Sequence, residues 1–396
     1  MISERDAWAV MASVPGLGPT TFGWLLREHG SALRVLDLAR TEAGRRAIRD
    51  GPADGEVDGH RRTRLRSALI DGLTAVAGDP EAIVAGIRAD GLRVVTVEDE
   101  PYPGRLRALE EPPPVLFVRG SVEALAARHA VAIVGTRRPT EAGRRVAARL
   151  ADAIARADAV VVSGLAVGID GAAHAAAVSA GRPTVAVLGS GHRRLFPRAH
   201  GRLAEAIVAG GGAVVSELPP DVEATRGTFP RRNRVISGLA EATVVVEAAA
   251  GSGALITARW ALEQGRGCFI VPGSIDAPAS TGCNGFLRDY PGLARIVAGV
   301  PELLDDLGIL EAEPAADRGQ VSIAALAASL GATAGRVARA LVEGVTTVDE
   351  LADRTDLPVA TVLGALTVLE IRGLVAGAYG RYRPVAALAA AAPGLP

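Results

Sequence analysis

The residues best suited to binding an anion lie between positions 229 and 257. Three arginines and an asparagine come just ahead of the apolar run 242–247: Arg231, Arg232, Asn233 and Arg234. The glycine-rich segment 251–257 follows that run, which predicts a buried strand and then a turn that opens a helix. Arginine forks, backbone N–H groups at a helix start and glycines that permit close approach suit a phosphodiester. We therefore expect an anion site, although a surface arginine cluster beside an ordinary strand, turn and helix would show the same letters.

Five expected strand ends carry glycine, hydroxyl, acidic or arginine residues. The loops that follow these strands contain Gly135–Arg138, Ser163–Asp170, Gly189–Gly191, Glu217 and Gly251–Gly253. The carboxyl ends of parallel strands meet at one edge of a sheet, which is where ligands bind in such folds. None of the loops is a complete Gly-x-Gly-x-x-Gly or phosphate-loop motif, so a dinucleotide fingerprint is not supported. We expect these loops to form a site for a phosphate-bearing ligand.

Three side chains in or near these loops each have two possible roles. Arg137 binds a phosphate or pairs with Glu141, and its place at a strand end favours the phosphate. Phe196 and Phe229 lie inside two acid-free arginine segments, 192–202 and 226–234. Each ring either stacks on an unpaired base or anchors its own loop.

Catalytic chemistry has weaker support in this sequence. Asp170 and His174 lie one helical turn apart, which permits an acid–base pair or a helix cap beside a packed histidine. Asp170, Glu217 and Glu247 form a metal site only if folding brings them together, and the surrounding arginines favour an anion instead. The chain contains no Gly-x-Ser-x-Gly sequence. We expect no catalytic residues, no metal and no cofactor.

The composition limits the kinds of partner. The chain has 396 residues and a formal net charge of −1, so nucleic-acid binding must depend on local patches. All 43 basic residues are arginine, which is typical of a GC-rich genome. Cys268 and Cys283 have no further cysteine or histidine at zinc-ligand spacing. No signal sequence or run of about 18 apolar residues is present, so we expect a soluble cytoplasmic protein.

The pattern over residues 79–306 predicts a doubly wound, mostly parallel α/β sheet. Short runs rich in β-branched residues alternate with helical stretches, as expected for strands covered on both faces. The expected strands are 93–97, 115–118, 131–135, 159–163, 184–189, 213–216, 242–247 and 268–271. The expected helices are 140–156, 170–180, 199–209, 233–239 and 254–264.

Smaller units flank this sheet. Residues 1–75 are expected to be helical, with Val14-Pro-Gly-Leu-Gly18 as the turn of a helix-hairpin-helix or of a plain helical hairpin. Residues 307–319 are predicted to be a linker, 320–385 a winged helix and 386–396 a disordered tail. Thr347 and Glu350 form a capping-box sequence. The expected recognition helix 358–372 carries only two charged residues, which favours a protein contact over groove reading.

Several motifs occur in an order that resembles the DNA-processing protein A family (DprA, also called Smf). They are Tyr102-Pro103, Pro112–Gly120, Val131–Arg137, Ser163–Asp170 with His174, Phe229-Pro-x-Arg-Asn-Arg234, Ser252-Gly253 with Thr257, and Val271–Gly273. The resemblance covers about residues 100 to 290. It implies an extended Rossmann-like domain that binds single-stranded DNA, forms a homodimer, and loads a RecA-type recombinase onto strands coated with single-strand-binding protein, notably in natural transformation.

The resemblance also implies the members of the DNA pocket. By motif position these are Gly135, Arg137, Ser163, Gly164, Arg232, Asn233, Arg234, Ser252 and Gly253; Arg231 and Phe229 join them from the arginine segment. Asp170, His174, Glu247 and Thr257 are expected to support the pocket. The chain departs from the family at Phe196 and His200, where tyrosine and asparagine are typical. It departs again where Cys283-Asn-Gly-Phe286 continues into Asp289-Tyr-Pro, since a Gly-Ala pair is usual there in the family.

Two alternatives use the same variety of fold. One is an enzyme similar to nucleotide phosphoribohydrolases of the lysine-decarboxylase-like group, and the other is a nucleotide-sensing module. The enzyme group has a Pro-Gly-Gly-x-Gly-Thr-x-x-Glu loop, whereas this chain has Ala250-Gly-Ser-Gly-Ala-Leu-Ile-Thr257. The lack of the double glycine and of the glutamate disfavours the enzyme.

Overall fold

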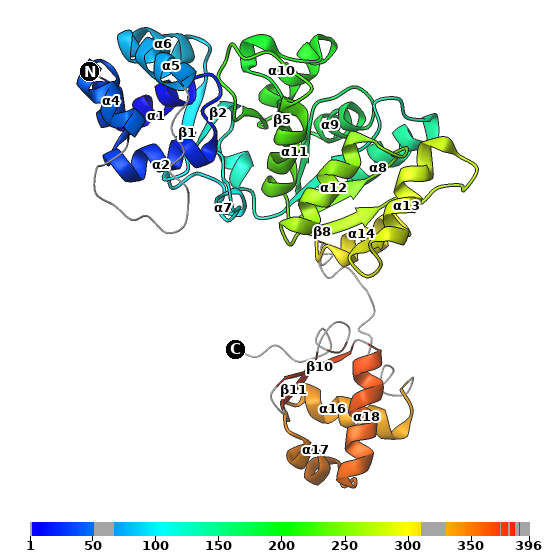
Figure 1. Ribbon diagram of the computed structural model, residues 1–396. Helices are drawn as coiled ribbons and strands as arrows, with labels where there is room; N and C mark the ends of the chain where they lie inside the picture. The colour runs from blue at the N-terminus through cyan, green and yellow to red at the C-terminus, as the bar shows by residue number, and fades with distance from the viewer. Residues whose placement is uncertain are drawn as a thin grey trace. The chain divides into compact units, whose positions relative to one another are not determined.

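The computed structural model describes residues 2–50, 67–309, 330–372, 374–378, 381–384 and 388. It forms two compact units, Met1–Leu310 and Glu311–Pro396 (Figure 1). No helix in the described ranges is both long enough and apolar enough to cross a membrane.

A nine-stranded sheet organises the first unit. Its strands are β1 (Arg93–Thr96), β2 (Val115–Gly120), β3 (Ala130–Val134), β4 (Val160–Ser163), β5 (Thr184–Val187), β6 (Ala213–Ser216), β7 (Ala242–Val245), β8 (Gly267–Ile270) and β9 (Ala294–Ile296). The order is β1-β2-β6-β5-β4-β3-β7-β8-β9. In this order the seven neighbouring strands that start with β6 and end with β9 all pair in parallel. The pairs β1 with β2 and β2 with β6 are antiparallel. The mostly parallel sheet is confirmed. The sequence analysis missed β9, which has only three residues.

Helices cover both faces of the sheet because successive strand residues point to opposite sides. Val131 and Ile133 of β3 pack with α8 (Glu141–Arg156) and α9 (Ile169–Ser179). Ala132 and Val134 pack with α11 (Thr228–Leu239) and α12 (Gly253–Glu263), which lie side by side in Figure 1. The remaining elements of this region are α7 (Gly104–Arg107), α10 (Gly201–Ala209), α13 (Thr281–Asp289), α14 (Val300–Asp306), η1 (Glu123–Ala126), η2 (His192–Arg194), η3 (Arg198–His200) and η4 (Pro278–Ser280).

The N-terminal helices belong to the same compact unit as the sheet. They are α1 (Glu4–Ala12), α2 (Pro19–His29), α3 (Ala32–Ala39), α4 (Glu42–Asp50), α5 (Ser67–Gly78) and α6 (Pro80–Ala89). Their apolar core includes Trp8 and Phe22 and continues into Val115 and Phe117 of β2. The expected turn between α1 and α2 is present, with Gly16 at φ 79°. Burial of β2 against these helices ties the two parts together.

The second unit has the two helices and the β-wing that the sequence predicts, and a further helix, α16 (Ala332–Val342), precedes them. The predicted elements are α17 (Val348–Thr355), α18 (Val359–Ile371) and the antiparallel pair β10 (Val375–Ala378) and β11 (Arg381–Pro384). The side chains of Thr347 and Glu350 form the expected capping box at the start of α17. Ile309, inside the expected linker, packs in the core of the first unit. The rest of that linker, and the expected tail apart from residue 388, lie outside the described residues.

Candidate functional site

A cavity of about 280 Å³ lies at the point where the strand order reverses. The chain runs from β3 outward to β4, β5 and β6, and α11 then returns it to β7 on the other side of β3. Ligands of doubly wound sheets bind in the crevice at this point. The lining includes many of the residues expected from the sequence: Gly135, Arg137, Asp170, Phe229, Arg232, Asn233, Ser252, Gly253 and Thr257. Val134, Ala166, Ile236 and Ala254 complete the wall, and none of them has a side-chain chemistry that a sequence pattern singles out.

Arg137 and Phe229 form the exposed part of this cavity. The Cζ atom of Arg137 lies 4.9 Å from the centroid of the Phe229 ring. Glu141, the alternative partner of Arg137, is 3.6 Å from Arg145 instead. The Arg137 guanidinium is exposed and has no carboxylate partner among the described residues. It is therefore available to a phosphate, while its flat face is held by the ring.

Arg232 lies at the buried end of the cavity. It donates hydrogen bonds to the carbonyl oxygens of Gly164 and Val187, at 2.5 and 2.6 Å. Burial lowers the pKa of Arg232 to about 10, so it stays charged at neutral pH. Its Nε–H has no acceptor among the described residues. Arg232 thus joins the loop after β4 to the end of β5 and offers one buried donor at the cavity. The direct contact to DNA that the sequence suggests stays a prediction.

Asp170 stabilises the same corner of the cavity. Its Oδ2 accepts hydrogen bonds from the backbone N–H groups of Gly164 and Ala166, at 3.2 and 3.3 Å. Burial raises the pKa of this carboxyl, and the charge of Arg232 acts in the opposite direction. A β-carbon on Gly164 would lie 2.2 Å from Nη1 of Arg232, so only glycine allows this contact. Ser163 is fully buried and donates from Oγ to the Ile133 carbonyl at 2.6 Å. Ser163 and Gly164 support the cavity without lining it.

The start of α12 forms the opposite wall. Ser252 caps this helix by accepting a hydrogen bond from the Ala254 N–H at 3.4 Å. Asn233 donates from Nδ2 to the Gly253 carbonyl at 3.2 Å, which joins α11 to α12. The first backbone N–H groups of a helix are natural donors to a phosphate.

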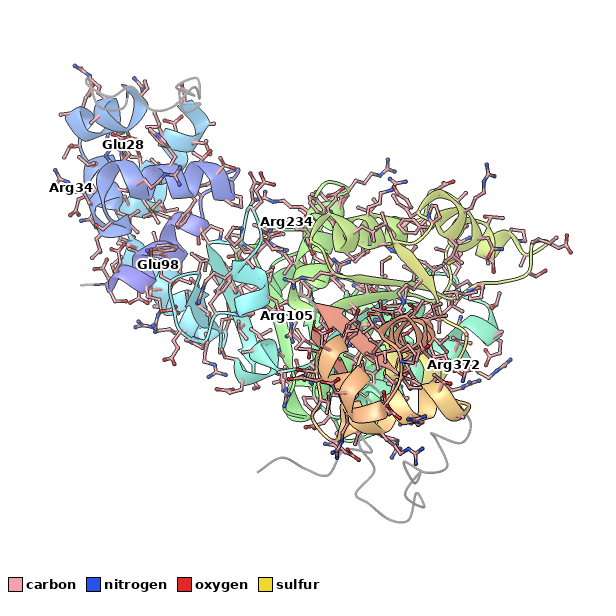
Figure 2. All side chains as sticks on the ribbon, turned by 90° about the horizontal axis from the view of Figure 1, so that it is seen from below. Glu28, Arg34, Glu98, Arg105, Arg234 and Arg372 are labelled. Atoms are coloured by element: carbon pink, nitrogen blue, oxygen red, sulfur yellow. The ribbon has the colours of Figure 1, made fainter. Side chains whose placement is uncertain are left out.

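The expected arginine cluster is divided between two sides of α11. The sequence predicted a helix from Asn233, but α11 begins at Thr228, so all three arginines lie on its turns. Arg234 is buried, pairs with the Glu217 carboxylate and donates to the Glu111 carbonyl at 2.9 Å. It lies where the N-terminal helices meet the sheet (Figure 2). Arg231 is half-exposed, with Nε 3.9 Å from Glu217. Neither Arg231 nor Arg234 lines the cavity of Arg137.

His174 and Glu247 have structural positions. His174 is fully buried and its Nδ1 lies 2.8 Å from Oγ1 of Thr184. Burial lowers the pKa of His174 to about 3, so it stays neutral and forms no acid–base pair with Asp170. Glu247 accepts a hydrogen bond from the Thr140 N–H at 2.8 Å and positions the loop after β3. The described residues contain no group of three histidine, cysteine or acidic side chains placed to hold a metal.

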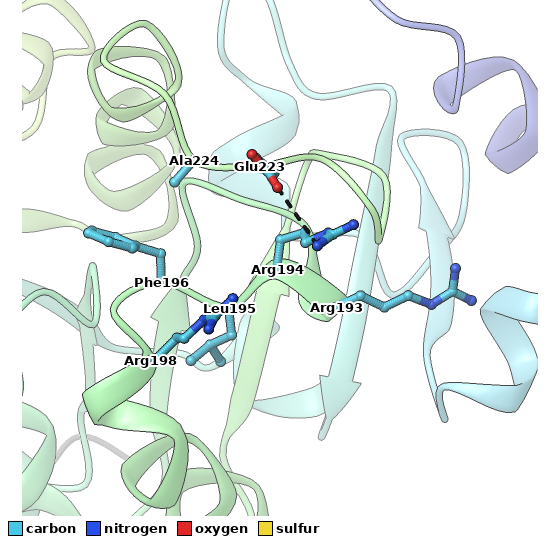
Figure 3. Close-up of a pocket in the computed structure, with 7 residues that line it drawn as sticks. All are labelled: Arg193, Arg194, Leu195, Phe196, Arg198, Glu223 and Ala224. Carbon is cyan, nitrogen blue, oxygen red and sulfur yellow. Dashed lines mark ion pairs between the residues drawn. The ribbon is translucent and has the colours of Figure 1, made fainter.

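A second cavity, of about 590 Å³, lies against the arginine segment 192–202 (Figure 3). It is lined by Arg193, Arg194, Leu195, Phe196, Arg198, Glu223 and Ala224. The segment is acid-free in sequence, but folding supplies carboxylates: Arg193 pairs with Asp90 and Asp221, and Arg194 lies 3.7 Å from Glu223. Among the described residues Arg198 has no such partner.

Two aromatic rings connect the two cavities. The ring centroids of Phe196 and Phe229 are 5.9 Å apart, and Phe196 is 46% exposed. Phe229 also packs against Gly189, where a β-carbon would lie 2.9 Å from the ring. The sequence departure at His200 is accommodated by a contact of 2.8 Å between its Nδ1 and the Leu165 carbonyl. The arrangement is a path of arginines and aromatic faces across the carboxyl ends of the strands.

Comparisons with known proteins identify relatives of both units of the chain. The family model described as DNA recombination-mediator protein A matches residues 93–308, and the one described as DprA winged helix domain matches residues 322–381. Protein Smf of Escherichia coli (strain K12) is 38% identical over 296 residues, which cover 73% of this chain and 76% of that protein. DNA processing protein DprA of Bacillus subtilis (strain 168) is 41% identical over 200 residues, 50% of this chain and 67% of that protein.

A solved structure shows the same likeness in three dimensions. DNA processing protein A (DprA) from Streptococcus pneumoniae superposes with a TM-score of 0.59 at 28% sequence identity. The match covers 77% of this chain and 98% of that one.

Proposed function

Because the chain belongs to the DNA recombination-mediator protein A family, we propose that it binds single-stranded DNA in the cavity at the ends of β3 and β4. The observation that carries this proposal is the Arg137 guanidinium held over the Phe229 ring. Single-strand binding sites combine cations that contact the backbone with aromatic faces for the bases. In a duplex the base faces are covered by their neighbours, so such a site selects unpaired strands.

Each wall of the cavity has a role in this proposal. Arg137 and the backbone N–H groups at the start of α12 bind phosphates. Phe196, which is 46% exposed, stacks on a base, while Phe229 holds the Arg137 guanidinium in place. Arg198 contacts the backbone where the strand crosses the second cavity. Asp170, Gly164 and Arg232 hold the loops in place beneath it. Base edges are not read, so binding is independent of sequence.

The cellular role follows from the family. We propose that the protein delivers a RecA-type recombinase to strands that are covered by single-strand-binding protein, in the cytoplasm and without catalytic turnover. Self-association has independent support from β9, an edge strand beside which Leu293 is 63% exposed and in which Ile296 is 54% exposed. Edge strands with apolar side chains tend to pair with another chain.

The deciding experiment is a titration with labelled oligothymidylate and with duplex of equal length, at salt concentrations from about 50 to about 200 mM. We expect tighter binding to the single strand and a steep loss of affinity with salt, because bound counterions are released. Equal affinity for the duplex, or no dependence on salt, would contradict the proposal. Light scattering of the same preparation tests the homodimer, with Ile296→Glu expected to shift the protein toward the monomer.

A further inference from the structure

A third cavity lies on the outer side of α11 and α12. It has a volume of about 760 Å³ and is lined by Gly18, Pro19 and Thr20 at the start of α2 and by side chains of the two helices. Pro230 and Arg231 come from α11, and Ile256, Arg259 and Trp260 come from α12. We call this cavity the outer groove. Nothing in the site described above uses it.

The outer groove and the candidate DNA site are lined by residues of the same two helices. Phe229 lines the cavity of Arg137, and Pro230, the next residue, lines the outer groove. Along α12, Gly253 lines the first cavity and Arg259 the outer groove. These two positions are about 9 Å apart along the helix axis, because an α-helix rises about 1.5 Å per residue.

Arg259 and Arg231 supply the positive charge of the outer groove. Arg259 is exposed and has no ion-pair or hydrogen-bond partner in the described part of the chain. The guanidinium of Arg231 is also on this side, since a β-carbon on Gly18 would be 3.8 Å from its Nη2. Glu217 holds Arg234, and Glu111 accepts a hydrogen bond from Oγ1 of Thr20 at 2.6 Å. Glu263 lies one turn beyond Arg259, farther from the first cavity.

Trp260 provides the aromatic surface of the groove. It is half-buried and lies one residue from Arg259 on α12. A cation for the phosphate next to an aromatic face for the base is the combination found in single-strand binding sites.

We propose that a single strand leaving the cavity of Arg137 crosses Pro230 and continues in the outer groove. There Arg231 and Arg259 bind its phosphates and Trp260 stacks on a base. The start of α2 forms one wall, so the N-terminal helices contribute to the DNA path. This inference rests on the proposed function, and it adds a second contact region that only a longer strand reaches.

The test compares oligothymidylates of about 4 and about 12 nucleotides, within the range of single-strand site sizes. Arg259→Ala is expected to weaken binding of the longer strand at least about fivefold and to leave the shorter strand unchanged. Arg137→Ala should weaken both. Arg149→Ala is the matched control, since Arg149 is an exposed arginine on α8, which covers the other face of the sheet.

Fluorescence gives a second readout at the groove. The long strand should quench the emission of Trp260, and Trp260→Phe should abolish that quenching while it retains most of the affinity. If Arg259→Ala and Trp260→Phe change neither affinity nor quenching while Arg137→Ala weakens both strands, the outer groove carries no DNA. If Arg137→Ala has no effect on either strand, the proposed function itself is wrong.

Discussion

Arg137 and Phe229 are 92 positions apart in the sequence, yet the guanidinium of one lies over the ring of the other at 4.9 Å. The contact joins the loop after β3 to the first turn of α11. A charged arginine over an aromatic face gains about 0.5–1 kcal/mol at an exposed site. It also restricts the orientation of a long side chain before any ligand arrives, so less conformational entropy is lost on binding.

Arg137→Ala is expected to weaken oligothymidylate binding by about 1–3 kcal/mol, the range for a charge-assisted contact. The protein should remain folded, because Arg137 is exposed and pairs with no carboxylate among the described residues. Fluorescence anisotropy measures the affinity and circular dichroism the folding. Unchanged affinity for this variant would move the site elsewhere.

Arg232→Ala is expected to destabilise the protein. The substitution removes both hydrogen bonds to the Gly164 and Val187 carbonyls and the positive charge near buried Asp170. Loss of one partner of a buried charged group costs about 3–5 kcal/mol. Urea denaturation measures the free energy of unfolding. A variant as stable as the parent, with reduced DNA affinity alone, would instead make Arg232 a direct ligand contact.

The glycines of the site should respond differently to alanine. Gly164→Ala places its β-carbon 2.2 Å from Arg232 and should lower the free energy of unfolding by more than about 2 kcal/mol. At Gly253 a β-carbon meets nothing within 4 Å, so Gly253→Ala should fold normally. Weaker DNA binding by folded Gly253→Ala would show that a phosphate approaches this backbone closely. Normal binding would place the strand farther from α12.

The stability of the protein should decrease as the pH falls from about 6.5 toward about 4. The pKa of His174 is 6.5 in the unfolded chain and about 3 when folded, so acidification protonates only the unfolded state. Each such proton lowers the free energy of unfolding by about 1.4 kcal/mol per pH unit. His174→Asn keeps a donor for Thr184 and should lower the slope of the free energy of unfolding against pH by the contribution of one proton. An unchanged slope would contradict the assignment.

No base release or strand cleavage is expected with AMP, CMP or a nicked duplex, with or without magnesium. Asp170, a carboxylate that lines the cavity, accepts hydrogen bonds from two backbone N–H groups. His174 is buried and stays neutral. Chromatography of the products after prolonged incubation gives the answer. Release of free adenine that disappears in a Glu247→Gln variant would place the protein among the enzymes.

The sequence by itself determines the architecture and which loops meet at one edge of the sheet. Short β-branched runs that are apolar on both faces require a sheet covered by helices, and eight of the nine strands are recognisable in this way. The carboxyl ends of parallel strands must meet at one edge, so Gly135, Arg137 and the turn at Ser252 are predictably close. Motif order also identifies the family, which the comparisons confirm.

Only the tertiary structure decides which of the neighbouring arginines lines the cavity of Arg137. α11 begins at Thr228 rather than Asn233, because Pro230 is tolerated within the first turn of a helix. Successive helix residues point about 100° apart, so Arg231 and Arg234 share the side of α11 that faces Glu217 and the outer groove, whereas Arg232 points to the Gly164 and Val187 carbonyls. Glu217 comes from the loop after β6, and Phe117 of β2 packs against the N-terminal helices. Such long-range partners are set by packing, which local sequence patterns do not encode.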